Sequence, residues 1–455
     1  MCEKDIQTHQ PTPGKCQPWK VAKLPVVGRV LIASRDIRPW EAVLTDTAVV
    51  QAPDDSPVCV GCLGAVSGDA VCARCRWPVC GVQCQEEEAH EEECRIFQKN
   101  NVVPCIENFD NNHWLYTALA VLRVLMVKKK DHESWVKVEA LMDHWEEREK
   151  DNKVAEAVNM MCQFFQRICK LEWVTLSDVQ HSFGVLKTNS VSLITCQGRS
   201  LYPLVSILSH SCSANLEPVC NPAKTITLRA KTHILEGEQL TMRYTNFIDS
   251  KWSIQAKLKN DWLFVCNCKR CEDVTELGSH FSSLQCPCGG YFYQTIQDPQ
   301  RHETICSKCE KCLDFTDKFL KFKEIESDLF SASAQNISEL CDVIEADKEI
   351  HDTFFLKTKA CMKYADIFKN TDNQEILENV VSRVKIVLNT LQLVDKGISK
   401  LMGSYLMVLA DCQQKQLKLM KAEGVISLQD LQRAVKELTR AKLTAVKMLS
   451  QHVIL

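Results

Sequence analysis

The sequence predicts a mixed α+β protein with a split antiparallel sheet, cysteine-rich metal modules and an all-helical C-terminal region. Three observations carry this prediction. Short β-branched segments occur on both sides of a long helical stretch, cysteines gather in two regions, and the chain beyond Asp317 has helical periodicity with almost no proline or glycine. With 455 residues, of which 45% are hydrophobic, the chain is long enough for two to four domains.

The elements follow in order along the chain. Residues 26–50 read as short strands separated by polar turns, and residues 108–180 carry apolar side chains three and four apart, as helices do. Strand-like text returns in NSVSLITC, LYPLVSIL, TITLRAKTHI and QLTMRY, so we expect insertions to split the sheet. Beyond Asp317, amphipathic segments resemble a tetratricopeptide-like (TPR-like) helical array.

Charge and composition restrict the possible partners and compartment. The formal net charge of -3 provides no global basic field for nucleic acid or an anionic membrane. The segment Met1–Trp19 contains no apolar run, so we expect no signal peptide or transmembrane helix there, and a cytoplasmic or nuclear protein. Because reducing compartments disfavour disulfides, the 26 cysteines favour metal binding.

The first cysteine-rich region has the spacing of zinc ligands. It supplies four ligand pairs, Cys59-x2-Cys62, Cys72-x2-Cys75, Cys80-x3-Cys84 and His90-x3-Cys94. Two-residue gaps let a turn direct both sulfurs at one ion, and three-residue gaps place side chains on one helical face. Four pairs are the number needed for two closed tetrahedral zinc sites, which we prefer to the alternative of buried thiols.

The second cysteine-rich region contains two further groups, Cys266-x-Cys268-x2-Cys271 and Cys286-x-Cys288 with Cys306-x2-Cys309. The latter resembles the two knuckles of a zinc ribbon, with a short strand predicted in the Tyr-Phe-Tyr text between them. Its one-residue gap is tight, and Cys312 is a competing ligand. Reduced structural cysteines are therefore the alternative for this fourth site.

Two motifs in the later strand region resemble a known family. The segment 201–215, LYPLVSILSHSCSAN, and the run EGEQL at 236–240 followed by Tyr244 resemble the motifs of SET and MYND domain-containing proteins, which are protein-lysine methyltransferases. The cysteine pairs of the first region resemble the MYND zinc finger. The likeness spans Val21 to Cys271, and the added ribbon and some motif drift suggest the arthropod-type branch.

The resemblance implies a split SET-type β core with a pseudoknot, an inserted MYND zinc finger, a helical insert and a post-SET zinc module. The expected domains are an N-terminal SET part at 20–57, the finger at 58–95, the insert at 100–185, the SET core at 186–247, the post-SET module at 248–273, a possible zinc ribbon at 284–312 and a helical C-terminal domain at 317–455.

The resemblance also implies site residues. S-adenosylmethionine would be held by Gly28, Arg29, Asn189, Ser209, His210, Tyr244 and Phe264, with Tyr244 catalytic. The finger ligands would interleave, with one zinc on Cys59, Cys62, Cys80 and Cys84 and another on Cys72, Cys75, His90 and Cys94. Cys212 would complete a third set with Cys266, Cys268 and Cys271, and the ribbon cysteines would hold a fourth ion.

The implied reaction explains why such a site uses aromatic side chains. A lysine amine must lose its proton before it attacks the sulfonium methyl, and its unperturbed pKa is about 10.4. A narrow apolar channel and the adjacent positive sulfonium both disfavour the ammonium form, and alignment of amine and methyl supplies the entropic part of catalysis. Tyrosines and backbone carbonyls suit this task.

Three departures from the family pattern keep a second hypothesis open. Val30 stands where the family has a second glycine, Ser209 replaces an asparagine, and Trp262 stands where relatives commonly carry tyrosine. A catalytically weak or inactive scaffold, acting as a transcriptional co-regulator, is therefore the alternative to a histone or non-histone methyltransferase. A zinc hydrolase is disfavoured because four-ligand sets leave no open coordination position.

The expected partners are proteins. The family's fingers are associated with proline-rich peptides, and we expect a protein-docking role because acidic residues disfavour phosphate binding here, namely Glu86, Glu87, Glu88, Glu91, Glu92 and Glu93. Other expectations are substrate proteins with a target lysine, a role in chromatin regulation, no membrane partner and a monomeric chain.

Overall fold

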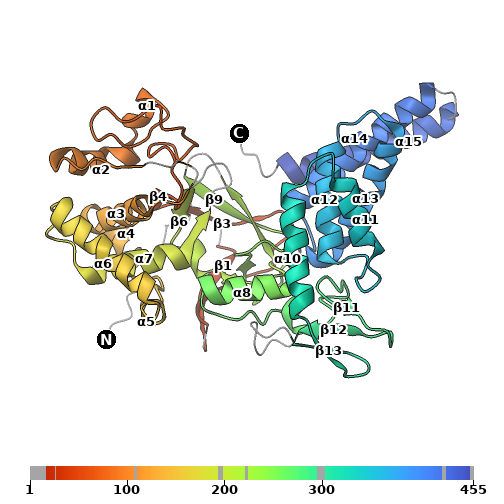
Figure 1. The fold of residues 1–455 in the computed structure, drawn as a ribbon, viewed down its shortest axis with the longest axis horizontal. Coiled ribbons are helices and arrows are strands. Elements are labelled where there is room, and N and C mark those ends of the chain that lie inside the picture. Colours follow the sequence, from red (N-terminus) through yellow and green to blue (C-terminus); the bar gives the residue numbers. More distant parts are fainter. Residues whose placement is uncertain are drawn as a thin grey trace.

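The computed structural model describes residues 17–25, 27–106, 109, 111–192, 198–220, 224–294, 303–422 and 427–450. Parts of several sequence predictions lie outside these residues, namely residues 1–16 of the N-terminal segment, the strand text at Val26 and 193–197, the beginning of the helical stretch at Asn108, residues 295–302 of the predicted ribbon, and residues 423–426 and 451–455 of the C-terminal region. Figure 1 shows a finger and a helical group on one side, small sheets in the centre, and a second helical group on the other side.

Short strands form the central part, as the sequence predicts. Strand β1 (Trp19–Leu24) pairs antiparallel with β2 (Gly28–Ala33), and β9 (Thr225–Ala230) lies between β3 (Ala42–Thr47) and β8 (Leu216–Cys220). A third sheet has β6 (Gly198–Leu201) between β4 (Val50–Pro53) and β5 (Ser190–Ser192). Segments more than 140 residues apart thus share sheets, which requires the intervening residues to form insertions.

One parallel strand pair lies beside these sheets and matters for the site. Strand β7 (Ser209–His210), which follows the 3-10 helix η2 (Val205–Ile207), pairs in parallel with β10 (Thr241–Met242). Apolar residues of β2, β3 and β9, such as Leu31, Leu44 and Leu228, form the core beneath this pair. The pair therefore rests on a packed support.

The finger and the insert share another core. Helices α1 (Val82–Gln85) and α2 (Glu88–Lys99) belong to the finger, and Trp77 packs against Phe97 and Tyr116. The insert contains α3 (Trp114–Lys130), α4 (His132–Glu139), α5 (Trp145–Arg148), α6 (Asn152–Gln163), the π-helix η1 (Phe164–Ile168) and α7 (Leu176–Asn189).

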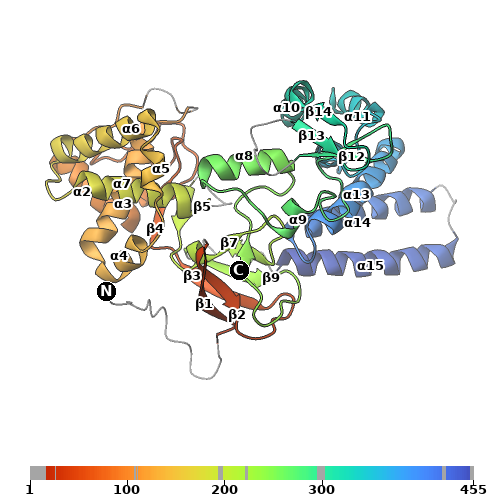
Figure 2. The same ribbon diagram turned by 90° about the horizontal axis from the view of Figure 1, so that it is seen from below.

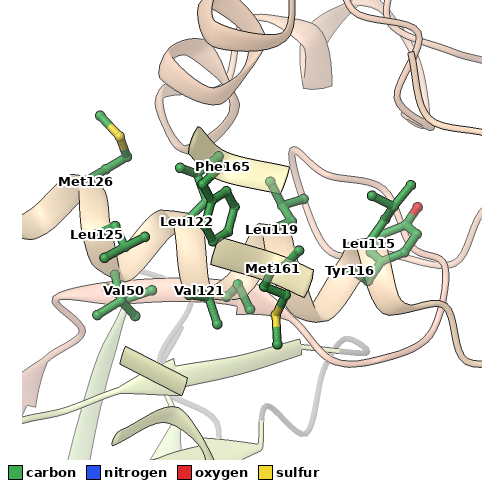
Figure 3. Close-up of a cluster of buried hydrophobic side chains, with 14 of the residues drawn as sticks. Val50, Leu115, Tyr116, Leu119, Val121, Leu122, Leu125, Met126, Met161 and Phe165 are labelled. Atoms are coloured by element: carbon green, nitrogen blue, oxygen red, sulfur yellow. The ribbon is translucent and has the colours of Figure 1, made fainter. Parts of the chain in front are cut away.

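Helix α3 lies at the centre of this core. Its residues from Leu115 to Met126, apart from Thr117, are buried, and Figure 3 shows Leu122 and Leu125 near Phe165 and Val50. A helix that is apolar on all sides must be covered on all sides. The finger and the insert cover α3 together, so they form one packed body.

The C-terminal part begins with short helices α8 (Lys251–Asp261) and α9 (Lys269–Glu272). A four-stranded antiparallel sheet follows, with β11 (Leu284–Gln285), β12 (Tyr291–Gln294), β13 (Glu303–Cys306) and β14 (Cys312–Asp314) in that order. Strand β12 carries the Tyr-Phe-Tyr text in which the sequence predicts a strand.

The helical region predicted beyond Asp317 is present. It contains α10 (Thr316–Ser331), α11 (Ile337–Ala346), α12 (Phe355–Phe368), α13 (Gln374–Val394), α14 (Lys400–Ala422) and α15 (Leu428–Ser450). Figure 2 shows α14 and α15 side by side. Among the described residues, no helix has both the length and the apolar character needed to cross a bilayer. The predicted mixed α+β class, with cysteine clusters and a helical C-terminal region, is confirmed.

Candidate active site and four cysteine clusters

The β7–β10 pair is held by a small network of polar side chains. Asn215 donates through Nδ2 to the Gln239 carbonyl at 2.9 Å and accepts the Thr241 amide at 2.9 Å through Oδ1. Gln239 in turn donates through Nε2 to the Ser209 hydroxyl at 2.8 Å. These bonds fix the two segments that the sequence analysis assigned to the active site, although they lie about thirty residues apart.

Tyr244 lies at the end of this pair in an aromatic surround. Its ring centroid is 5.3 Å from that of His210, 5.4 Å from that of Trp262 and 6.5 Å from that of Phe264. Its hydroxyl donates to the Leu208 carbonyl at 2.5 Å. Burial raises the pKa of Tyr244, so the side chain remains a neutral phenol at physiological pH.

His210 is bonded within the protein at both ring nitrogens. Nδ1 accepts the backbone N–H of Tyr244 at 3.0 Å, and Nε2 lies 3.4 Å from the Cys212 sulfur. The ring therefore ties Tyr244 to the cysteine cluster that contains Cys212. A bound molecule could therefore contact the face of the imidazole ring. The cofactor contact predicted for His210 from the sequence did not specify an atom.

Two further predicted cofactor residues, Arg29 and Asn189, bond a segment for which the sequence predicted no role in the site. Arg29 donates to the Ala140 carbonyl at 2.5 Å, and Asn189 donates to the Met142 carbonyl at 2.8 Å. Gly28 has a positive φ of 81°, and no atom lies within 4 Å of where a Cβ would be. The loop between α4 and α5 therefore borders the proposed cofactor residues.

The sequence offered little signal for this loop. It is the five-residue connection Ala-Leu-Met-Asp-His between two helices, and its contacts to Arg29 and Asn189 run through backbone carbonyls, which any residue type provides. The one local sign is His144, which adopts the left-handed conformation with φ of 53°. The left-handed conformation of a histidine in a loop is visible in the structure but cannot be predicted from the sequence.

The structure shows what surrounds two of the three residues that depart from the family pattern. Val30 is fully buried in β2, opposite Ala22 of β1, so its side chain packs within the protein. Trp262, the residue that caps the C-terminus of α8, lies against Tyr244 with an interplanar angle of 38°. The indole is thus part of the aromatic surround of Tyr244.

The cysteines form four groups that could hold metal ions, and in each group the four ligand atoms lie within 4.8 Å of one another. We name them the first finger set (Cys59, Cys62, Cys80, Cys84), the second finger set (Cys72, Cys75, His90, Cys94), the core set (Cys212, Cys266, Cys268, Cys271) and the ribbon set (Cys286, Cys288, Cys306, Cys309). The interleaved partition of the finger ligands is the one that the family resemblance implies.

Sulfur separations support metal ligation in all four sets. One sulfur pair from each set illustrates this: Cys62–Cys80 at 3.5 Å, Cys72–Cys94 at 3.7 Å, Cys212–Cys271 at 3.5 Å and Cys288–Cys306 at 3.4 Å. Tetrahedral zinc with Zn–S bonds of about 2.3 Å places sulfurs about 3.8 Å apart, whereas a disulfide requires about 2.05 Å. The donor set fits zinc.

The second finger set has an orienting carboxylate that the sequence analysis misplaced. Glu93 was counted among the solvent-facing acidic residues of the finger, but it is buried, with 2% of its surface exposed. Glu93 accepts from His90 Nδ1 at 2.9 Å and from Arg123 Nε and Nη2 at 2.7 Å. A carboxylate behind a ligating histidine fixes its tautomer and direction, so Glu93 supports the metal set.

The core set links the SHSC segment to the chain after α8. Gln255 of α8 donates to the Cys266 carbonyl at 2.7 Å and accepts the Cys266 amide at 2.9 Å, which fixes the backbone at this ligand. Because Cys212 lies two residues after His210, an ion in this set would hold the His210–Tyr244 contact in place.

The structure also shows which of the two competing cysteines, Cys309 or Cys312, completes the ribbon set. Cys309 belongs to the set, whereas Cys312 begins β14, is exposed and approaches the Glu310 carbonyl at 3.9 Å. Gly290 allows the two knuckles to meet, because a Cβ there would lie 2.8 Å from the Cys306 sulfur. The second glycine of the Cys-Gly-Gly text therefore has a steric role.

Comparisons with known proteins agree with this arrangement. The SET domain model matches residues 28–245. Histone-lysine N-methyltransferase ASHR1 of Arabidopsis thaliana is 28% identical over 318 residues, which cover 64% of this chain and 63% of that protein. SET domain-containing protein SmydA-8, isoform A, of Drosophila melanogaster is 26% identical over 362 residues, which cover 74% of this chain and 75% of that protein.

Two more distant similarities complete the comparison. Histone-lysine N-methyltransferase SMYD3 of Mus musculus is 24% identical over 54% of this chain and 59% of its own length. The solved SET domain of LSMT bound to lysine and AdoHcy is 16% identical, with a TM-score of 0.34 and coverage of 89% of each chain. At that TM-score the structural likeness carries no weight, and the assignment rests on the family model and the sequence relatives. Residues 28–245 of the chain are therefore similar to SET domains, and the relatives that it resembles at modest identity include SMYD proteins and histone-lysine N-methyltransferases.

Proposed function

We propose that this protein transfers methyl groups from S-adenosylmethionine to lysine side chains of other proteins. The observation that carries the proposal is the position of Tyr244, which lies at the end of the β7–β10 pair within a surround of His210, Trp262 and Phe264. An apolar aromatic surround strips water from an amine and so favours its neutral, nucleophilic form. The SET domain model match, which includes His210 and Tyr244, supports the same reaction.

Tyr244 would position the amine and would not serve as the base. Burial raises the pKa of Tyr244, so a phenolate is not populated at neutral pH. The hydroxyl hydrogen is donated to the Leu208 carbonyl, which directs the oxygen lone pairs elsewhere. Those lone pairs can accept an N–H of the substrate amine and align its own lone pair.

The proposed cofactor residues fit S-adenosylmethionine in their chemistry. Gly28 leaves open space beside a turn, Arg29 supplies a cation, and Phe264 supplies an aromatic face. Asn189 uses its amide hydrogens on the Met142 and Val185 carbonyls, which leaves Oδ1 as the acceptor for a ligand. When bound, the cofactor supplies an electrophilic methyl group. We propose Ser209, His210 and Tyr244 as further contacts.

We propose that the four cysteine sets hold structural zinc, one ion each. All four supply complete ligand groups, so none offers a coordination position for catalysis. The zinc content of the purified chain tests this. We expect four ions per chain, and three ions would contradict the ribbon site.

The finger is proposed to dock protein segments, with proline-rich chains as the expected class. Glu88, Glu91 and Glu92 remain on the accessible side of α2, which still disfavours nucleic acid, although Glu93 no longer contributes. Measurable DNA binding by the full chain at physiological salt would contradict this role. We retain a cytoplasmic or nuclear location, a monomeric chain, a chromatin role and the arthropod-type branch as proposals.

The second candidate function is a scaffold with weak or absent transfer activity. One observation favours it: the Ser209 hydroxyl already accepts a bond from Gln239 at 2.8 Å, so less of this side chain is available to a cofactor than an asparagine would offer. Trp262 against Tyr244 also adds bulk where the substrate amine would enter.

Calorimetric titration of S-adenosylmethionine into zinc-replete protein separates the two functions. A methyltransferase should show saturable binding and label transfer to lysine-containing proteins, with transfer abolished in Tyr244→Phe while cofactor binding persists. Val66→Ala, which lies in the finger, is a control that should preserve both. Absence of binding by folded, zinc-replete protein would leave the scaffold.

A further inference from the structure

A pocket of about 280 Å³ lies in the helical insert, outside the Tyr244 site. Its walls come from α4, from the α4–α5 loop with the beginning of α5, and from the first half of α7, three elements that adjoin in Figure 2. The side chains that matter are two indoles, three carboxylates and one imidazole, namely Trp135, Trp145, Glu139, Asp143, Asp178 and His181. None of these residues was assigned a role above.

The pocket carries an excess of negative charge. Glu139, Asp143 and Asp178 provide three carboxylates, which outnumber the two cations bonded to these residues: Lys128 donates to the Asp178 carboxylate, and Arg148 donates through Nε to the Asp143 carbonyl at 3.1 Å. His181 bonds Asp143 at 2.6 Å through Nδ1. A cation entering the pocket would therefore meet a net negative site of mixed carboxylate and aromatic character.

One wall already receives an alkylammonium group from within the chain. The Lys128 ammonium lies 5.4 Å from the centroid of the Trp135 ring and also donates to Asp178. A carboxylate and an indole face thus bind a lysine side chain here in cis. Trp145 and Glu139 supply a second indole and a second carboxylate to the pocket lining.

Two buried polar atoms of the pocket residues lack partners. Among the residues that the structure describes, neither His181 Nε2 nor Trp145 Nε1 has a hydrogen-bond partner. In the neutral tautomer that donates the Nδ1 hydrogen to Asp143, His181 Nε2 has a lone pair, which can accept an N–H. Trp145 Nε1 is a donor only and accepts nothing, so it suits a carbonyl beside the cation. Leaving both unpaired costs free energy that a ligand would recover.

We propose that this pocket binds alkylammonium groups that carry at least one N–H, of the class of a lysine, monomethyl-lysine or dimethyl-lysine side chain within a peptide. Carboxylates and indoles attract the charge, His181 Nε2 accepts the N–H, and Trp145 Nε1 donates to a peptide carbonyl. The site does not depend on the transfer reaction, because Tyr244 is not part of it. It would let the protein hold one lysine of a chain while another residue occupies the Tyr244 site.

The pocket also touches the segment that borders the proposed cofactor residues. Asp143 and Trp145 line the pocket, whereas the carbonyls of Ala140 and Met142, in the same loop, accept bonds from Arg29 and Asn189. A Cβ at Gly184 of α7 would lie 2.5 Å from the Asp143 carbonyl oxygen, so helix and loop are in close contact. A ligand bound in the pocket would therefore affect the position of the α4–α5 loop.

Fluorine NMR of the full zinc-replete chain labelled with 5-fluorotryptophan tests the proposal. The chain has nine tryptophans, and Trp145→Phe and Trp262→Phe assign the signals of the pocket and of the Tyr244 site separately. Titration with N-methylbutylammonium should shift the Trp145 signal saturably. The uncharged isostere, a methyl butyl ether, should not shift it.

Variants locate the binding. Glu139→Gln, a change at an exposed position, should weaken binding about fivefold through loss of one charge. His181→Gln should reduce the preference for N-methylbutylammonium over N,N,N-trimethylbutylammonium. Glu146→Gln on α5, outside the pocket, should change nothing. A shift of the Trp262 signal alone, or equal shifts with the ether, would overturn the proposal. Failure of label transfer with intact Trp145 shifts would affect only the methyltransferase assignment.

Discussion

Two buried ion networks join parts of this molecule, and they differ in redundancy. Between finger and insert, Arg123 pairs with Glu93 and also donates to the Gln51 carbonyl at 2.9 Å and the Val60 carbonyl at 2.6 Å. Between the central strands and the C-terminal helices, Asp395 accepts from both Lys231 and Arg243.

The second network shares its charges. Glu217 lies 3.0 Å from Arg243 and 3.6 Å from Lys231, so each cation has two acids. In the finger network one carboxylate serves one guanidinium. Removing a partner from a buried pair is costly because an uncompensated charge remains, and a shared network reduces that cost. We therefore expect substitutions in the finger network to lower the free energy of unfolding more than substitutions in the network of Asp395. The second finger set also depends on Arg123, a residue of α3.

The largest effect is expected for Arg123→Met. This change leaves the Glu93 carboxylate buried without its cation and should lower the free energy of unfolding by about 3–5 kcal/mol. Urea unfolding together with zinc retention measures it, and we expect loss of the ion of the second finger set. Arg95→Met, whose partners Glu91 and Glu92 are at the surface, is the control and should cost no more than ~1 kcal/mol. Equal effects of the two changes would remove the contrast between the networks.

Asp395→Asn should have a smaller effect. Lys231 and Arg243 keep Glu217, so we expect a loss of about 2 kcal/mol, which is the cost of weakening a buried bond to a charged group. Unfolding followed by circular dichroism gives the value. A loss as large as that of Arg123→Met would show that the shared acid does not compensate.

The pH dependence sharpens the same point. Burial opposes ionisation of Asp395, but the charges of Arg243 and Lys231 outweigh it and hold the pKa of Asp395 below its ordinary value of 3.8. A carboxyl group whose pKa is lower in the folded than in the unfolded state stabilises the fold at pH values above the unfolded-state pKa. This stabilisation is lost as the pH falls through the folded-state pKa. The stability difference between the wild-type chain and Asp395→Asn should therefore be constant from pH 7 to about 5 and shrink below about 4. A difference that shrinks already between pH 7 and 6 would contradict this origin.

The smallest effect concerns the ribbon set. All four ligands of the second finger set are buried, whereas Cys309 of the ribbon set is exposed. A chelator should therefore remove the ribbon zinc before the zinc of the second finger set, and Cys309→Ser should lower the zinc content by one ion per chain. Cys312→Ser, just outside the set, is the matched control and should retain all ions. Metal analysis during timed exposure to chelator distinguishes the order of release.

Local spacing predicted much of the fold and of the metal sets. Strand and helix periods are local properties, so the split strands, the helical insert and the C-terminal helices were predictable. The pairing of Cys72 and Cys75 with His90 and Cys94 came from the family resemblance, because spacing alone provides pairs and does not say which pairs share an ion. The structure brings these four together.

Contacts over long sequence separations escaped prediction. Asp395 ends α13, and nothing nearby in the sequence indicates Lys231 or Arg243 as partners. The burial of Glu93 could have been found, since three-residue spacing places it on the same face of α2 as His90. The α4–α5 loop contacts Arg29 and Asn189 through carbonyls, which carry no residue signature.

Arg243 immediately precedes Tyr244 in the chain, and its guanidinium is bonded to Asp395 at the end of α13. The segment after β10 that carries Tyr244, the proposed active-site tyrosine, is therefore anchored to the C-terminal helices. A fragment that stops after residue 245 would contain the whole region matched by the SET model, but it would lack Asp395 and uncover the Lys231 and Arg243 cations. The smallest autonomous unit for Tyr244 chemistry is consequently much longer than the domain by which relatives are recognised, and expression fragments should extend at least through α13.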